Sequence, residues 1–286
     1  MTDLTGRTCL VTGATRGVGR ATAEALAKLG ANVIIHGRDS AAVGAVCRAT
    51  LRMARGGQVT GAVADFAALK SVRRMAEEVA AQHPRLHVLV NNAGTGATQR
   101  RETTDGFEWS FGVNHLAPFL LTKLLLPTVT KSAPARIVTV ASMAYRRAGL
   151  DFDDLQFQRR KYRTMQAYSE SKLANILFTL ELSRRVAGTG VTANCVHPGV
   201  VATNMFSSLG GPLGKFFGVL LRPLFLSPAA GAKTSVHVAS APELATISGR
   251  FFERSREVSL DPNAQDAAAA RRLWEISEDL VARAKA

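Results

Sequence analysis

Short apolar runs rich in β-branched residues alternate with longer amphipathic segments along the whole chain. The runs predict strands and the segments predict helices. The predicted strands are Thr8–Thr12, Asn32–His36, Gln58–Ala64, His87–Val90, Arg136–Ala141, Thr192–Val196 and Gly249–Glu253. The predicted helices are Val18–Leu29, Ala41–Ala54, Leu69–Gln82, Thr104–Thr130, Gln166–Val186, Ala229–Ser240 and Ala267–Ala284. This alternation indicates right-handed βαβ crossovers, so we expect an α/β fold with a doubly wound parallel sheet of about seven strands.

The predicted strands are apolar along most of their length, as in Arg136-Ile137-Val138-Thr139-Val140. Strands of this kind are buried on both faces, with helices covering each side of the sheet. No repeat or linker interrupts the pattern, so residues 1–286 are expected to form a single Rossmann-type domain. The irregular stretch at 203–228 is rich in glycine before an apolar patch, and long insertions of this kind are usually lids or binding loops.

Composition places the chain among ordinary globular proteins, with 47% hydrophobic and 20% charged residues. The charge is less ordinary, because 36 Lys and Arg stand against 22 Asp and Glu, for a formal net charge of +14. Such an excess suits an anionic partner: a nucleic acid, a membrane or a phosphorylated ligand. The basic residues are dispersed in pairs such as Arg73-Arg74 and Arg271-Arg272, so we expect solvated faces and no nucleic-acid site.

Cysteine usage and the apolar stretches bear on the compartment. Cys9, Cys47 and Cys195 are odd in number and show no metal-ligand spacing, so neither a disulfide framework nor a metal site is expected. The first residues lack the pattern of a secretory signal, and no apolar stretch reaches the length of a transmembrane segment. We therefore expect a cytoplasmic protein without a transmembrane segment.

A glycine-rich turn joins the first predicted strand to the first helix. Glycines there let the backbone approach a pyrophosphate, and the helix N-terminus stabilises its charge. Such turns also end strands for steric reasons, but the position between strand and helix favours a nucleotide site. The predicted phosphate-turn residues are Gly13, Thr15, Arg16, Gly17, Val18 and Gly19.

The spacing Thr-Gly-x-x-x-Gly-x-Gly at Thr12–Gly19 resembles the nucleotide motif of the short-chain dehydrogenase/reductase family. The other marks of that family follow in its order along the chain and cover nearly all of it. They are Asn91-Asn92-Ala93-Gly94, Asn114, Ser142, Tyr168-Ser169-Glu170-Ser171-Lys172 and Pro198-Gly199.

Four of these residues are implied to be catalytic by the resemblance. Tyr168 would be the general acid/base, Lys172 would tune it and bind the nicotinamide ribose, and Ser142 would orient the substrate oxygen. Asn114 would hold a water that completes a proton relay. The four-residue spacing places Tyr168 and Lys172 on one helix face, where an ammonium would lower the tyrosine pKa. Each residue taken singly suits packing or capping, but no folding requirement asks for all four together.

The cofactor implied is a nicotinamide dinucleotide, with NADP(H) favoured over NAD(H). Gly37 stands where NAD-preferring relatives carry an acid, and Arg38 and Arg16 supply cations for a 2′-phosphate. The alternative for Arg38 is a solvated loop residue paired with Asp39. Asp65 resembles the residue that holds the adenine amino group, and it also suits a helix cap.

The remaining cofactor contacts are implied by the same resemblance. They are Phe66, Asn92, Ala93, Gly94, Tyr168, Lys172, Pro198, Gly199, Val201 and Thr203.

Two stretches, Tyr168–Phe178 and Leu273–Ser277, resemble the retinol dehydrogenase branch, which includes relatives of the WW-domain oxidoreductase and of protochlorophyllide reductase. The branch implies interconversion of a carbonyl and an alcohol on a small apolar substrate. Ser142 and, within an apolar stretch at 206–226, Phe206, Phe216 and Phe217 are the candidate substrate contacts. That stretch suits a lid, a subunit contact or a membrane-surface patch.

Two rival functions follow from the same residues. One is reduction of a carbon–carbon double bond, as in protochlorophyllide reductase. The other is a binding protein that senses NADP(H) without catalysis, against which the complete set of four catalytic residues argues. The family commonly forms dimers or tetramers, so a homodimer or homotetramer is expected.

Overall fold

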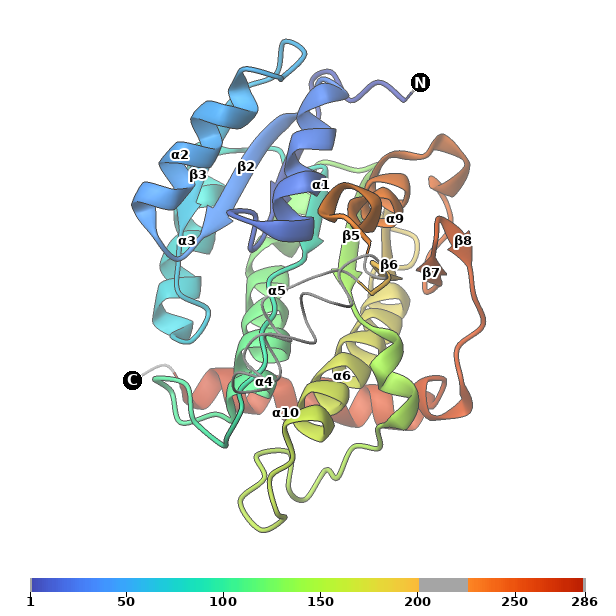
Figure 1. The fold of residues 1–286 in the computed structure, drawn as a ribbon. Helices are drawn as coiled ribbons and strands as arrows, with labels where there is room; N and C mark the ends of the chain where they lie inside the picture. The colour runs from blue at the N-terminus through green and yellow to red at the C-terminus, as the bar shows by residue number, and fades with distance from the viewer. Residues whose placement is uncertain (1, 201–225, 285–286) are drawn as a thin grey trace.

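The computed structural model describes residues 2–200 and 226–284, and its core is one eight-stranded sheet (Figure 1). The strand order is β3-β2-β1-β4-β5-β6-β7-β8; the pairs from β3 through β7 are parallel, and β8 is antiparallel to β7. The strands are β1 (Thr8–Val11), β2 (Asn32–Gly37), β3 (Val59–Val63), β4 (Val88–Asn91), β5 (Ala135–Val140), β6 (Val191–His197), β7 (Phe251–Glu253) and β8 (Arg256–Glu257).

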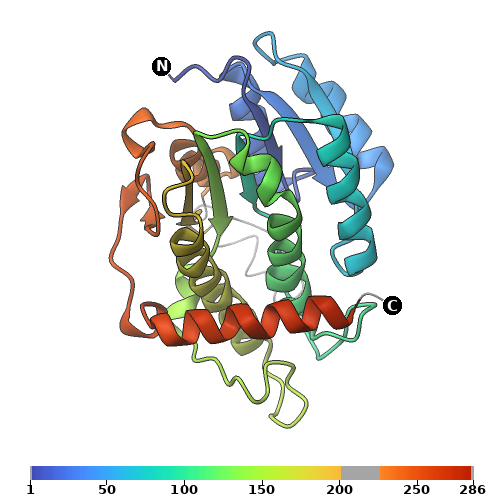
Figure 2. The same cartoon turned by 180° about the vertical axis from the view of Figure 1, so that it is seen from behind.

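Helices cover both faces of this sheet (Figures 1 and 2). The α-helices are α1 (Gly17–Lys28), α2 (Ser40–Leu51), α3 (Leu69–Gln82), α4 (Trp109–Phe111), α5 (Ala117–Thr130), α6 (Thr164–Arg185), α9 (Pro228–Ser240) and α10 (Ala267–Arg283). A π-helical segment, η1 (Gly112–Leu116), joins α4 to α5, and the 3₁₀ turns are η2 (Met143–Arg147), η4 (Pro242–Leu244) and η5 (Pro262–Ala264). Helix α10 runs across the outside of α6, as Figure 2 shows. The chain therefore has a single-domain, Rossmann-like α/β fold.

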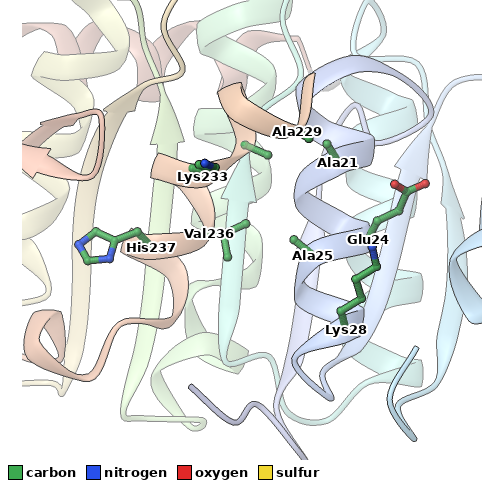
Figure 3. Close-up of a pocket in the computed structure, with 9 residues that line it drawn as sticks. Ala21, Glu24, Ala25, Lys28, Ala229, Lys233, Val236 and His237 are labelled. Carbon is green, nitrogen blue, oxygen red and sulfur yellow. The ribbon is translucent and has the colours of Figure 1, made fainter. Parts of the chain in front are cut away.

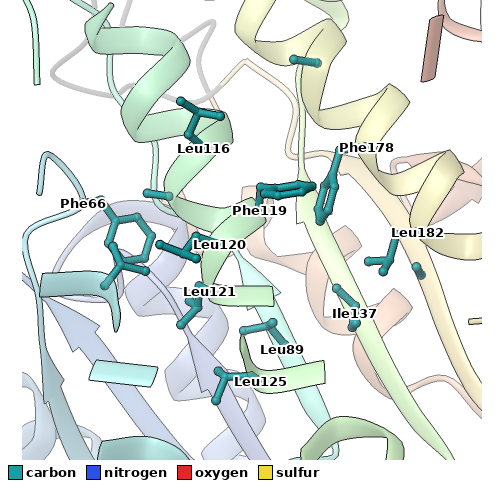
Figure 4. Close-up of a cluster of buried hydrophobic side chains, with 14 of the residues drawn as sticks. Phe66, Leu89, Leu116, Phe119, Leu120, Leu121, Leu125, Ile137, Phe178 and Leu182 are labelled. Atoms are coloured by element: carbon teal, nitrogen blue, oxygen red, sulfur yellow. The ribbon is translucent and has the colours of Figure 1, made fainter. Parts of the chain in front are cut away.

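The sheet is buried on both sides because successive strand residues enter different cores. In β1, Leu10 packs with the residues of α3, α5 and α6, while Cys9 and Val11 pack with those of α1 and α9. Figure 4 shows part of the larger core, where Phe119 of α5 lies beside Phe178 of α6. This arrangement explains why the strands are apolar without strict alternation.

The seven predicted strands and the fold class are confirmed, each strand to within a few residues at its ends. The two-residue strand β8 was not predicted. The predicted helix Thr104–Thr130 is wrong at its start, because Gly106 has φ +81 in a turn before the helix. The first α-helical residue is Trp109, capped by the Glu108 carboxylate, which accepts hydrogen bonds from the backbone N–H groups of Ser110 and Phe111.

Two further findings concern the described residues. None of their helices is both long and apolar enough to cross a membrane. They contain no group of three or more His, Cys, Asp or Glu side chains placed to hold a metal ion.

Candidate active site

The predicted site residues follow the carboxyl ends of adjacent parallel strands. The glycine-rich turn follows β1, Asn92 follows β4, Ser142 follows β5 and Pro198 follows β6. The strand order reverses direction between β1 and β4, and open α/β sheets bind ligands at such a switch point. The fold thus brings motifs that are far apart in the sequence together at one edge of the sheet, the carboxyl ends of its parallel strands.

The turn after β1 needs its glycines for close packing. Gly13 has φ +62, and a Cβ there would stand 2.8 Å from the Cα of Ala93. A Cβ on Gly19 would stand 2.3 Å from Nδ2 of Asn92. Helix α1 begins at Gly17, and the side chain of its N-cap residue, Arg16, forms no capping hydrogen bond. Its first N–H groups are therefore available to an anion.

Thr12 and Asn92 tie this turn to the end of β4. The Thr12 hydroxyl oxygen accepts hydrogen bonds of 2.9 Å from the backbone N–H groups of Asn92 and Ala93. Asn92 Nδ2 in turn donates to the carbonyl of Thr12 over 2.7 Å. The sequence motif contains Thr12, but its spacing alone gave no indication that Thr12 joins the two predicted cofactor segments.

His36, at the end of β2, holds the same turn from the other side, and the sequence analysis missed it. Its Nδ1 accepts a hydrogen bond from the Gly13 N–H over 3.1 Å, and its Nε2 lies 3.1 Å from the Ala64 carbonyl. Since Nδ1 accepts, Nε2 carries the proton and donates. Burial lowers the pKa of His36 to about 4, so the ring is neutral at physiological pH. The ring stacks on Phe66, at 4.4 Å between centroids, and Phe66 is buried beneath it.

The two cations predicted to bind a 2′-phosphate are exposed, and neither forms an ion pair within residues 2–200 and 226–284. The Asp39 carboxylate accepts a hydrogen bond from the Ala42 N–H as the cap of α2, so it is not paired with Arg38. A Cβ on Gly37 would stand 2.4 Å from Thr15 Cγ2, so only glycine lets β2 approach the turn this closely. Asp65 is exposed, and its carboxylate accepts from the Ala67 N–H within a turn; the alternative of a helix cap is wrong, because α3 begins at Leu69 with Ala68 as its N-cap.

The structure brings three of the predicted catalytic residues together. The Ser142 side chain lies near that of Tyr168, and the Lys172 ammonium lies 5.6 Å from the centroid of the tyrosine ring. Lys172 Nζ donates to the Val140 carbonyl over 3.1 Å. The Ser142 hydroxyl oxygen also accepts a weak hydrogen bond of 3.3 Å from the Ala144 N–H, at the start of η2.

Burial governs the electrostatics of this group. It raises the pKa of Tyr168, and the nearby Ser142 side chain opposes that rise. It also lowers the pKa of Lys172 to about 8. The expected net lowering of the tyrosine pKa by the lysine is therefore not found, because desolvation of the phenolate outweighs other effects. Tyr168 keeps its proton at neutral pH, as a proton donor must.

Asn114 lies in the π-helical segment η1, beside the same group. Its Nδ2 donates to the Thr95 carbonyl over 2.8 Å and to the Ser171 hydroxyl over 3.0 Å, and its Oδ1 accepts from the Thr95 N–H. A Cβ on Gly94 would lie 3.3 Å from Lys172 Nζ and 3.5 Å from Asn114 Oδ1. Asn114 and Lys172 therefore meet at the exposed Gly94, and Lys172 also lies beside the Tyr168 ring.

Some predictions lie outside the described residues. Pro198 and Gly199 follow β6 as expected, with Gly199 at φ +82. The remaining predicted cofactor and substrate contacts fall within 201–225, as does most of the predicted lid at 203–228. They are Val201, Thr203, Phe206, Phe216 and Phe217.

A separate surface pocket of about 360 Å³ lies between α1 and α9 (Figure 3). Ala21 and Lys28 of α1 and Ala229 and Lys233 of α9 are among its lining residues. None of the predicted catalytic or cofactor residues lines it. We therefore place the candidate active site at the carboxyl ends of the strands, where the predicted catalytic residues lie, and not in this pocket.

Comparisons with known proteins show the family of this chain. The model of the short chain dehydrogenase family matches residues 7–212. Retinol dehydrogenase 14 of Homo sapiens is 45% identical, over 96% of this chain and 86% of that protein. Retinol dehydrogenase 13 of Homo sapiens is 43% identical, over 96% and 85%.

Solved structures are also similar to this chain. A crystal structure of an uncharacterized protein from Mycobacterium paratuberculosis superposes with a TM-score of 0.81 and 36% identity, over 99% of this chain and 96% of that one. A short chain dehydrogenase from Burkholderia cenocepacia in complex with NADP superposes with a TM-score of 0.69 and 27% identity, over 87% and 96%.

Proposed function

Because the chain belongs to the short-chain dehydrogenase family, in its retinol dehydrogenase-like branch, we propose that it uses NADP(H) to interconvert a carbonyl and an alcohol on an apolar substrate. The family and its relatives make it an oxidoreductase acting on these groups. The observation that carries the finer proposal is the buried Lys172 ammonium, which lies beside the Tyr168 ring and close to Asn114 across Gly94.

In this mechanism Tyr168 donates its proton to the oxygen of the carbonyl as that oxygen gains charge. The Ser142 hydroxyl, which lies near that of Tyr168, orients the same oxygen. The buried Lys172 ammonium beside the ring stabilises the phenolate left after proton transfer. Asn114, held by its hydrogen bonds to Thr95 and Ser171, lies next to Gly94, close to the Lys172 ammonium. In the oxidation direction Tyr168 acts as the base.

The chain's residues fit a dinucleotide at the sheet edge. The N-terminus of α1 and the turn at Gly13 would hold the pyrophosphate, and the segment at Asn92 would flank the nicotinamide side. A bound nicotinamide supplies or accepts the hydride. The exposed guanidinium groups of Arg16 and Arg38, free of ion pairs among the described residues, suit the additional phosphate of NADP(H).

The substrate class rests on the branch. Several relatives are named as retinol dehydrogenases, so apolar aldehydes and ketones, retinal among them, are the first compounds to test. With NADPH as the hydride donor, we expect consumption of the cofactor with at least one apolar carbonyl and much slower consumption with NADH.

The test is a panel of apolar aldehydes, ketones and polycyclic carbonyls, each assayed with NADPH and with NADH at matched concentrations. Small polar carbonyls serve as the control series. Binding of NADPH without turnover of any member would overturn the proposal and favour the cofactor-binding alternative.

A further inference from the structure

The imidazole of His36 lies between two segments that are expected to hold the dinucleotide. It belongs to β2, and its side chain is almost fully buried. Its Nδ1 accepts a hydrogen bond from the Gly13 N–H over 3.1 Å, in the turn after β1, and its Nε2 donates to the Ala64 carbonyl over 3.1 Å. Ala64 directly precedes Asp65, the residue expected to bind the adenine amino group. One ring therefore joins the turn expected to hold the pyrophosphate to the segment expected to hold the adenine.

The backbone of His36 holds the same turn. Its carbonyl accepts a hydrogen bond from the Ala14 N–H over 2.8 Å. Two consecutive N–H groups of the turn, those of Gly13 and Ala14, are therefore used within the protein. The N–H groups left for an anion are those further along, at the N-terminus of α1. The contacts of His36 thus determine which donors of the turn face a ligand.

Packing and hydrogen bonding allow the ring only one orientation. Its face stacks on Phe66, at 4.4 Å between centroids and 22° between planes. Phe66 belongs to the larger core, where Figure 4 shows it beside Leu120. Turning the ring over would set carbon atoms against the Gly13 N–H and the Ala64 carbonyl. Because these two partners need one acceptor and one donor, only the neutral ring with its proton on Nε2 satisfies both.

We propose that the His36 ring is a positioning residue for the cofactor, which holds the turn at Gly13 in the conformation that binds the pyrophosphate. The pyrophosphate is common to NADPH and NADH, so His36 serves both cofactors alike. Arg38, two residues further along, would in contrast contact only the 2′-phosphate of NADP(H). The inference rests on the proposed function for its ligand, but the protonated nitrogen of the ring is measurable in the free protein.

Two variants separate the two hydrogen bonds of the ring. In His36→Asn the amide oxygen replaces Nδ1 and retains an acceptor for the Gly13 N–H. In His36→Gln the amide lies one bond further out, where its nitrogen replaces Nε2 and donates to the Ala64 carbonyl, and the acceptor for Gly13 is lost. Without that acceptor the turn leaves its binding conformation, and the fraction of protein ready to bind falls.

The measurement is the Kd of NADPH and of NADH, obtained by fluorescence titration without substrate. We expect both Kd values to rise roughly 3- to 10-fold in His36→Gln, the net value of one hydrogen bond, and to stay within about twofold of wild type in His36→Asn. Wild-type affinity in His36→Gln, or an equal loss of affinity in the two variants, would overturn the inference.

The matched control is His87→Gln. His87 is also buried, and its Nδ1 accepts a hydrogen bond from the Thr8 N–H over 2.9 Å, at the opposite end of β1 from the turn. This variant is expected to lose thermal stability about as much as His36→Gln, with both Kd values within about twofold of wild type. Weakened binding of the same size in His87→Gln would mean that a general loss of stability, and not the contact with Gly13, governs affinity.

A second readout needs neither ligand nor a folded glutamine variant. In wild-type protein labelled with ¹⁵N-histidine, the ring resonances of His36, assigned by their loss in His36→Asn, report which nitrogen carries the proton. At neutral pH we expect the proton on Nε2 and none on Nδ1. A proton on Nδ1 refutes the inference, whereas a wild type that has the expected ring but binds neither NADPH nor NADH refutes the proposed function.

Discussion

Arg38 is the residue on which the proposed preference for NADP(H) depends most directly. It is exposed at the end of β2, and the neighbouring carboxylate of Asp39 is engaged as the cap of α2. Its guanidinium therefore forms no ion pair with another described residue. A hydrogen bond between charged groups contributes about 1.5–3 kcal/mol, which corresponds to a factor of roughly 10 to 100 in affinity.

Arg38→Ala is accordingly expected to raise the KM for NADPH roughly 10- to 100-fold and to leave the KM for NADH within about twofold. Arg52→Ala, an exposed arginine at the other end of α2, is the control and should change neither. Steady-state kinetics with both cofactors makes the measurement. An equal rise in both KM values would show that Arg38 supports the fold or the shared part of the dinucleotide.

The candidate site residues could be named from the sequence because they occur in local motifs with fixed spacing. Their supporting contacts could not. His36 joins Gly13 to Ala64, and His115 bonds to Ser277, so each contact spans elements far apart in the chain. A lone histidine in an apolar run gives no indication of such partners.

At the scale of elements, hydrophobic periodicity predicted the parallel sheet well because its central strands are buried on both faces. It failed where backbone geometry departs from the regular helix. The segment before Trp109 is a turn closed by Thr103 and Gly106, and Gly112–Leu116 is π-helical. A period near 3.6 runs through all of it, so hydrophobic pattern alone cannot distinguish these states.

The structure explains how the connection from η2 to α6 is held. Arg160 binds the carboxylates of Asp154 and Glu170, both almost fully buried, and its guanidinium lies over the Phe157 ring. This contact fastens the connection to the first turns of α6, on which Tyr168 lies. Arg160, one of the arginines that make the chain basic, thus has a structural role.

Other arginines that contribute to the net charge of +14 also form contacts within the molecule. Arg136 donates to the carbonyls of Val238 and Ala241 at the end of α9, and Arg185 lies over Trp274 of α10. Cations used within the molecule do not form a continuous basic surface. At the scale of the whole molecule, the charge therefore gives weaker information about partners than its size suggests, although it favours the approach of a polyanionic cofactor.

Buried histidines make the stability of the whole molecule dependent on pH. Burial lowers the pKa of His36 to about 4 and of His115 to about 3, from 6.5. Below pH 6.5 the unfolded chain binds protons that the folded chain excludes. The stabilisation is complete above pH 6.5 and is lost as the pH falls toward these lower values, by about 1.4 kcal/mol per pH unit for each histidine.

Urea unfolding between pH 6.5 and pH 5 tests this expectation. The free energy of unfolding of the wild type should fall with pH, and His36→Asn should reduce the slope by about 1.4 kcal/mol per pH unit, because one titrating ring is removed. The asparagine Oδ1 retains an acceptor for the Gly13 N–H. The same slope in both proteins would mean that His36 titrates alike in the folded and unfolded states.

In the proposed mechanism Tyr168 supplies the proton for carbonyl reduction with NADPH. The most direct measurement compares Tyr168→Phe with the wild type, using the best carbonyl from the panel for turnover and fluorescence titration for NADPH affinity. The account predicts a loss of kcat of at least roughly 100-fold, the scale of general acid catalysis, with NADPH affinity within about twofold of wild type. Turnover by the variant within a few-fold of the wild type would contradict it.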